Sequence, residues 1–364
     1  MKYSLIIPVY NRPDEVDELL ASLEVQTLKD FEVVVVEDGS TIPCLNVVNE
    51  HASRLALRYY QKENSGPGQS RNYGAERSQG EYLIVLDSDC VLPPGYLQAV
   101  DDELTRKPCD AFGGPDRAHD SFTPVQKAIN YSMTSFFTTG GIRGGKKKLD
   151  KFYPRSFNMG IKAGLYQRLG GFSAMRFGED IDFSIRIFKS GASCRLFPEA
   201  WVWHKRRTDM KKFFKQVHNS GIARINLMKR HPGSMKLVHM LPAVFTLGVL
   251  FLALLFVSGF SLTAANVCGI LTKSVQQDTS MYSVGVYLGI VAMVGALIPL
   301  LLYSLLIFVD SLLQNKSCKV AWLSIKASFI QLLGYGTGFI RAWWLRCVCG
   351  RNEELQAFKN NFYQ

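Results

Sequence analysis

Two aspartates directly follow a strongly apolar stretch in the first third of the chain. Asp87 and Asp89 stand at i and i+2 after Tyr82–Leu86. Carboxylates at this spacing can ligate one hard divalent cation, because Mg²⁺ or Mn²⁺ on a diphosphate takes few protein ligands and completes its octahedron with phosphate oxygens. A solvated acidic turn is the alternative. The apolar run before the pair, and a second acidic turn at Asp38, favour the cation site.

A second acidic pair occurs where the pattern predicts the start of a helix. Glu179 and Asp180 follow Gly178 and precede apolar residues at helical spacing. A carboxylate here can take the proton of an attacking hydroxyl, which contributes roughly 10²–10⁴-fold to a rate. An acidic helix start favoured by the helix dipole is the alternative, and we assign Asp182 to that role.

The elements that must position these residues alternate along the chain. Largely apolar runs of residues that favour strands, at 3–9, 31–36, 58–60 and 82–86, are separated by helical patterns. Continuous apolar strands alternating with helices indicate a parallel sheet covered on both faces. In a Rossmann-like α/β domain ligands bind at the carboxyl edge of the strands, where both acidic turns fall. No G-x-G-x-x-G follows the first run, which argues against a dinucleotide-dependent dehydrogenase.

The chain changes character near residue 236. We expect a cytosolic catalytic domain at 1–236, a membrane region at 237–340 and a basic tail at 341–364. The stretches 237–260 and 284–309 contain no Asp, Glu, Lys or Arg and exceed the ~20 residues that a membrane span needs. The stretch 320–340 is more polar and is either a third span or an interfacial helix.

The distribution of charge along the chain predicts that the catalytic domain lies on the cytoplasmic side of the membrane. The formal net charge is +11, and many of the basic residues gather between Lys205 and Lys236, directly before the first apolar stretch. Basic residues beside a span mark the cytoplasmic side and attract anionic lipids. No nucleic-acid motif accompanies the charge, so we expect membrane lipids rather than nucleic acid as partners. The predicted location is the cell (inner) membrane, multi-pass, with the catalytic domain cytoplasmic.

Five segments, in this order, resemble the glycosyltransferase family 2 pattern of the GT-A fold. They are SLIIPVYN at 4–11, VEDGST at 36–41, GPGQSRN at 66–72, DSD at 87–89, and the stretch 158–186 with its GGF and GEDID. The resemblance covers about residues 3–204. The stretch 216–232 resembles the exopolysaccharide-type transferases related to succinoglycan biosynthesis.

The resemblance implies roles on the donor side. A nucleotide sugar would be bound by residues at the ends of the first strands, with the nucleotide pocket lined by Pro8, Tyr10 and Asn11. Asp38 would hydrogen-bond the nucleotide base, and Asp87 would contact the ribose or sugar. Arg71 would pair with the diphosphate, and a structural salt bridge is the alternative for it.

It also implies the catalytic roles. Asp89 would hold Mn²⁺ or Mg²⁺ together with Asp87, and the cation would neutralise charge on the leaving nucleoside diphosphate. His204 would complete the metal shell, with a structural histidine as the alternative. Asp180 is the candidate general base of an inverting transfer, and Glu179 is the second candidate.

The predicted function is therefore that of an inverting, metal-dependent glycosyltransferase. It would move one sugar from a nucleotide-sugar donor to a polyprenyl-linked glycan in cell-surface polysaccharide biosynthesis. A processive polysaccharide synthase of the same family is one alternative, but such enzymes carry QxxRW, and here Val-His-Asn-Ser follows Gln216. A non-catalytic nucleotide-binding membrane scaffold is another, and the intact acidic pairs argue against it.

Overall fold

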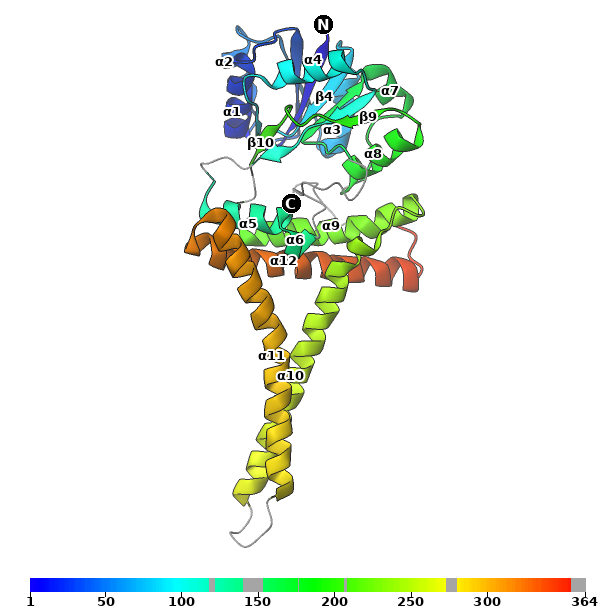
Figure 1. Cartoon of the computed structure of the whole chain (residues 1–364). Coiled ribbons are helices and arrows are strands. Elements are labelled where there is room, and N and C mark those ends of the chain that lie inside the picture. The colour runs from blue at the N-terminus through cyan, green and yellow to red at the C-terminus, as the bar shows by residue number, and fades with distance from the viewer. Residues whose placement is uncertain (118–121, 140–152, 176, 206–207, 273–279, 355–364) are drawn as a thin grey trace.

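The computed structural model describes residues 1–117, 122–139, 153–175, 177–205, 208–272 and 280–354. It has three parts stacked along one axis: an α/β domain, a layer of helices beneath it, and a long helical hairpin that extends away from both (Figure 1).

The first four main strands form the parallel half of a seven-stranded sheet with the order β3-β2-β1-β4-β8-β6-β9. These strands are β1 (Tyr3–Val9), β2 (Phe31–Asp38), β3 (Leu57–Lys62) and β4 (Tyr82–Leu86). All residues of β1, β2 and β4 are buried, as expected for continuous apolar runs covered on both faces. The predicted strands are therefore present, with β2 and β3 longer than predicted.

Alternate residues of each strand pack against different helices. Leu5 and Ile7 of β1 belong to the core under one set of helices, α1 (Pro13–Glu24), α2 (Leu45–His51) and α4 (Tyr96–Arg106). Ile6 points to the opposite face, which is covered by α3 (Pro67–Ala75), α7 (Ala163–Arg168) and α8 (Glu179–Lys189). The two-residue period of the strand thus supplies two cores from one sequence run.

The other half of the sheet contains one reversed strand, β8 (Asn158–Lys162), and then returns to the direction of β4. Strand β8 runs antiparallel to β4, and β6 (Ala111–Gly113) and β9 (Cys194–Leu196) follow it. A small second sheet joins β5 (Cys90–Val91), β10 (Val202–His204) and β7 (Asp116–Arg117). In its register His204 pairs with Cys90, which places that histidine beside the turn that follows β4.

The middle layer consists of helices that lie across the hairpin axis: α5 (Pro124–Thr134), α6 (Phe136–Thr139), α9 (Met210–Arg230) and α12 (Cys318–Trp343) (Figure 1). Helices α9 and α12 approach closely because glycines line their contact. A Cβ added to Gly338 would lie 2.0 Å from the His218 carbonyl oxygen, and one on Gly221 would lie 2.1 Å from that of Tyr335. The short π-helix η2 (Trp344–Val348) continues α12.

Helix α12 contains residues 320–340, for which a third span and an interfacial helix are the two expectations. It packs along α9 and α5 and runs crosswise to the two hairpin helices (Figure 1), an arrangement that favours the interfacial helix, which stays a prediction.

The hairpin consists of α10 (Leu241–Thr272), which follows a short 3-10 helix η1 (Leu237–His239), and α11 (Ser280–Asn315). Both are long and apolar enough to cross a membrane by length and composition. The helices extend beyond the predicted stretches 237–260 and 284–309, because residues 261–272 and 280–283 are also helical. The 32 residues of α10 correspond to ~48 Å, more than the ~30 Å hydrocarbon core. Small residues allow the two helices to meet, as where Gly259 faces Gly289.

The glycine contact between α9 and α12 yields a stability prediction. We expect Gly338→Leu to destabilise the protein by at least ~1–3 kcal/mol, because the added side chain must displace the α9 backbone. Gly248→Leu is the matched control, since a Cβ on Gly248 in α10 meets nothing within 4 Å. Thermal unfolding of both variants in detergent tests this. Equal melting temperatures for the two variants would contradict the assigned contact.

Candidate active site

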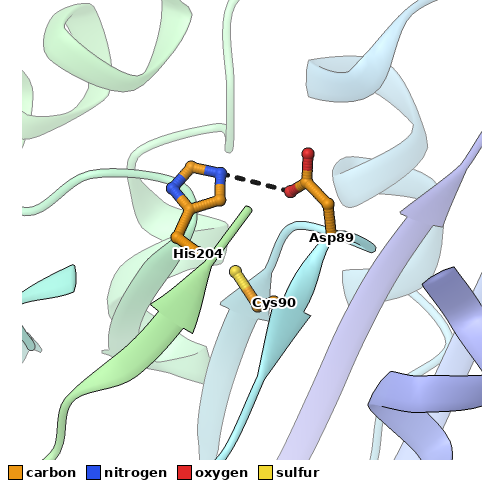
Figure 2. A group of neighbouring side chains, drawn as sticks. All are labelled: Asp89, Cys90 and His204. Atoms are coloured by element: carbon orange, nitrogen blue, oxygen red, sulfur yellow. Dashed lines mark ion pairs between the residues drawn. The ribbon is translucent and has the colours of Figure 1, made fainter. Parts of the chain in front are cut away.

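The turn after β4 carries the Asp87-Ser88-Asp89 motif to the carboxyl edge of the parallel strands. Asp89 lies between two basic side chains: Arg12 Nη1 is 2.5 Å from Oδ2, and His204 Nε2 is 3.2 Å from Oδ1. Figure 2 shows the imidazole of His204 and the carboxylate of Asp89 facing each other, with Cys90 beside them. Burial alone would raise the pKa of Asp89, but His204 and Arg12 together hold it well below its usual range. Asp89 is therefore ionised at any physiological pH.

The ligand chemistry at this turn fits a hard divalent cation. Ligand atoms of Asp89, Cys90 and His204 all lie within 4.8 Å of one another. Asp89 Oδ1 is buried and faces His204 Nε2 at 3.2 Å, so the carboxylate and the imidazole point at the same position. Cys90 is a poor ligand, because burial, reinforced by the neighbouring carboxylates, raises the pKa of its thiol well above the usual value. Asp89 and His204 would hold Mg²⁺ or Mn²⁺.

Arg71 joins the Asp87 turn to the second acidic pair. Its Nη2 lies 2.7 Å from Asp87 Oδ1, and its Nη1 lies 3.0 Å from Glu179 Oε1. The side chain is 3% exposed, and its guanidinium lies 5.2 Å from the centre of the Phe172 ring. The arrangement agrees with the structural salt bridge that was the alternative for Arg71. Asp87 is the more open partner, with 30% of its side chain exposed.

The start of α8 places Glu179 and Asp180 in different electrostatic surroundings. Gly178 adopts a left-handed φ of +84° just before them, a conformation that favours glycine. Burial would raise the pKa of Asp180, but Arg155, whose Nε lies 2.6 Å from Oδ2, lowers it below its usual range. Burial and the charge of Asp180 raise the pKa of Glu179 to about 7, although Arg71 opposes this shift. One carboxylate is thus firmly ionised and its neighbour titrates near neutrality.

The predicted donor-side residues lie at the ends of β1 and β2. Asn11 has a left-handed φ of +54°, and its Oδ1 accepts hydrogen bonds from the backbone N–H groups of Thr41, at 2.8 Å, and Ile42, at 2.9 Å. It therefore ties the turn after β1 to the turn after β2. Tyr10 is half-buried next to it, whereas Pro8 is buried inside β1.

Asp38 is fully buried, which sequence reasoning did not foresee. Its carboxylate accepts hydrogen bonds from the N–H groups of Ser65, at 2.9 Å, and Gly66, at 2.8 Å, and also pairs with Lys62. In this structure Asp38 therefore fixes the turn before α3. Its contact with a nucleotide base stays a prediction that requires this turn to move.

Two arginines at the site were missed in the sequence. Arg12 directly follows the SLIIPVYN motif, and its place at the end of β1 could have suggested a contact with the neighbouring acidic turn. Arg155 lies in a stretch with no recognisable motif, and only the fold brings it to Asp180.

The comparisons with known proteins agree with this geometry. Residues 4–170 match the family described as Glycosyl transferase family 2. The chain carries a glycosyltransferase family 2 domain. The family that the sequence motifs indicated is therefore confirmed for this part of the chain.

Curated relatives share this family but align over limited lengths. The poly(ribitol-phosphate) beta-N-acetylglucosaminyltransferase TarS of Staphylococcus aureus strain Mu50 is 41% identical over 93 residues, which is 24% of this chain and 16% of that protein. An uncharacterized glycosyltransferase of Haemophilus influenzae is 30% identical over 194 residues, 51% of this chain and 62% of the relative. In each case the match spans less than two thirds of the relative's length.

A solved structure shares the fold of nearly the whole chain. It is the mannosyltransferase PcManGT from Pyrobaculum calidifontis in complex with GDP-Man and Mn²⁺, with a TM-score of 0.54 and 16% identity. The match covers 94% of this chain and 87% of that one. The predicted GT-A fold followed by long apolar C-terminal helices is confirmed.

The raised pKa of Glu179 predicts a pH dependence of stability. Because the folded state holds this proton up to about pH 7 and the unfolded chain releases it near 4.5, the free energy of unfolding should fall as pH rises through that window. Glu179→Gln removes this pH-dependent loss of stability. The difference in melting temperature, variant minus wild type, should therefore be larger at pH 8 than at pH 5 by at least about 2 °C. A constant or decreasing difference in thermal melts would contradict the assignment.

Proposed function

We propose that the protein is an inverting, metal-dependent glycosyltransferase that moves one sugar from a nucleotide-sugar donor to a lipid-linked glycan. The observation that carries the proposal is the bridge through Arg71. It places the Asp87-Ser88-Asp89 turn, where donor and cation would bind, next to Glu179 and Asp180, where an acceptor hydroxyl would be deprotonated. The shared fold supports the donor and cofactor classes, since the structure of PcManGT holds GDP-Man and Mn²⁺.

The reaction follows from the charges at this edge. The acceptor hydroxyl oxygen forms a bond to the anomeric carbon of the donor sugar while the bond from that carbon to the diphosphate oxygen breaks. The hydroxyl proton passes to Asp180, which Arg155 keeps ionised and oriented, and attack opposite to the leaving group inverts the anomeric configuration. When bound, the cation supplies Lewis-acid neutralisation of the charge on the departing nucleoside diphosphate.

The lower part of the molecule supports a membrane-borne acceptor. Exposed tryptophans at the level of the helical layer, Trp322, Trp343 and Trp344, are of the kind found at membrane–water interfaces. Exposed basic residues surround the start of α10 and the end of α11 and contribute ~1 kcal/mol each on an anionic surface; they are Lys229, Arg230, Lys236, Lys316 and Lys319. We place the catalytic domain on the cytoplasmic side of the cell membrane, in the biosynthesis of a surface polysaccharide.

The first test concerns the base. We expect Asp180→Asn to lower kcat by roughly 10²–10⁴-fold with little change in donor affinity, because the amide cannot accept the proton of the acceptor hydroxyl. Asp102→Asn is the matched control, since Asp102 is exposed on α4. Sugar transfer by membranes, with a panel of nucleotide sugars and extracted lipid-linked oligosaccharide, measures the rates.

The same assay separates the two acidic candidates. If Asp180 is the base, kcat stays level through pH 7, because the pKa of this carboxyl lies below its usual range. A rate that rises to a plateau above about pH 7, together with complete loss of transfer in Glu179→Gln, would assign the base to Glu179 instead.

The second test concerns the cation. Chelation by EDTA should abolish transfer, and Mn²⁺ or Mg²⁺ should restore it in the wild type but not in Asp89→Asn, which lacks the anionic ligand. Full transfer after chelation, or by Asp89→Asn, would contradict metal dependence through this residue.

A further inference from the structure

Arg12 occupies the carboxylate that the proposed cation needs. Arg12 Nη1 lies 2.5 Å from Asp89 Oδ2, while the other oxygen faces His204 Nε2 at 3.2 Å. Both oxygens of the carboxylate therefore face a basic side chain. The ion pair is shielded from water, because only 12% of the Asp89 side chain and 28% of the Arg12 side chain are exposed.

The fold fixes the position of Arg12. Asn11, directly before it, is held in its left-handed conformation by hydrogen bonds from the turn after β2. The carbonyl of Arg12 then accepts the first hydrogen bond of α1, from Val16 N–H at 3.1 Å. The guanidinium thus reaches Asp89 from a constrained turn and not from a flexible surface segment.

The other two site arginines are committed to different carboxylates. Both Nη atoms of Arg71 are used by Asp87 and Glu179, and Arg155 pairs with Asp180. Of these three arginines, Arg12 is the one whose charge lies against Asp89.

We propose that Arg12 is an exchangeable counterion, which keeps free divalent cation off Asp89 and pairs with the diphosphate when cation and donor bind together. A cation on Asp89 Oδ2 would lie within a few ångströms of the guanidinium, and the two positive charges repel strongly in a site with little water. A diphosphate that arrives with the cation reverses this balance, because its oxygens offer the guanidinium a bidentate partner in place of Asp89. The cation is then loaded with the donor and not before it.

This inference rests on the proposed metal-dependent function, and binding measurements test it without turnover. Mn²⁺ is titrated into the purified full chain in detergent, alone and with inorganic pyrophosphate, and free Mn²⁺ is measured by electron paramagnetic resonance. The variants are Arg12→Gln, Arg12→Lys and, as control, Arg54→Gln, an exposed arginine that pairs with Glu24 away from the site. Circular dichroism and thermal melts establish that each variant is folded.

In the wild type we expect weak binding of Mn²⁺ alone and at least about tenfold tighter binding with pyrophosphate. Arg12→Gln should bind Mn²⁺ alone about tenfold more tightly than wild type and gain less from pyrophosphate. Arg12→Lys, which keeps the charge but not the planar fork, should resemble the wild type with Mn²⁺ alone and gain less from pyrophosphate. Arg54→Gln should resemble the wild type in both titrations.

Two results would overturn the inference. One is Arg12→Gln with an affinity for Mn²⁺ alone within twofold of wild type, while Asp89→Asn loses Mn²⁺; the metal site would then stand and the counterion role would fall. The other is Asp89→Asn with unchanged Mn²⁺ affinity, which would remove both the metal site and the role of Arg12.

Discussion

The buried guanidinium of Arg71 connects the two halves of the candidate active site. A parallel sheet collects acidic turns at one edge, and α8 adds two more carboxylates from the opposite half of the domain, so like charges accumulate where little water reaches them. Arg71 offsets this repulsion with one hydrogen bond to Asp87 and another to Glu179. Removing one partner of a buried pair typically costs 3–5 kcal/mol. The arginine is therefore a constraint on the fold as well as on the site.

The arginine pairs also give neighbouring carboxyl groups different pKa values. Asp89 and Asp180 each have a close basic partner and have lowered pKa values, whereas Glu179 is dominated by burial and by the adjacent Asp180 charge. One edge of the sheet can thus present the fixed negative charge of Asp89 to a cation. The start of α8 presents Glu179, which exchanges a proton near neutral pH. The layer of α5, α9 and α12 holds this edge at a set distance above the apolar hairpin (Figure 1). The glycan of a lipid-borne acceptor would therefore reach the site above this helical layer.

Much of the fold could be predicted because its signals are local. The runs at Tyr3–Val9 and Tyr82–Leu86 are apolar apart from Ser4, and such runs between helical patterns indicate few structures other than a covered parallel sheet. The same holds for the acidic turns, which need only a strand before them. The direction of α12 could not be predicted, because its glycines and Lys326 fit a span and a surface helix equally well. The close approach of Gly338 to the α9 backbone shows how α12 packs, and this packing could not be predicted from the sequence. The roles of Arg12 and Arg155 could not be predicted for a related reason. Their partners, Asp89 and Asp180, lie 77 and 25 residues further along the chain.

We propose that this edge of the sheet transfers one sugar with inversion to an acceptor at the membrane. The most direct measurement uses the full chain in lipid vesicles with nucleotide sugars of known anomeric configuration and extracted lipid-linked glycans. We expect a product that partitions into the organic phase, extended by a single sugar whose anomeric configuration is opposite to that in the donor. A product with retained configuration, or a water-soluble polymer of many sugars, would contradict it.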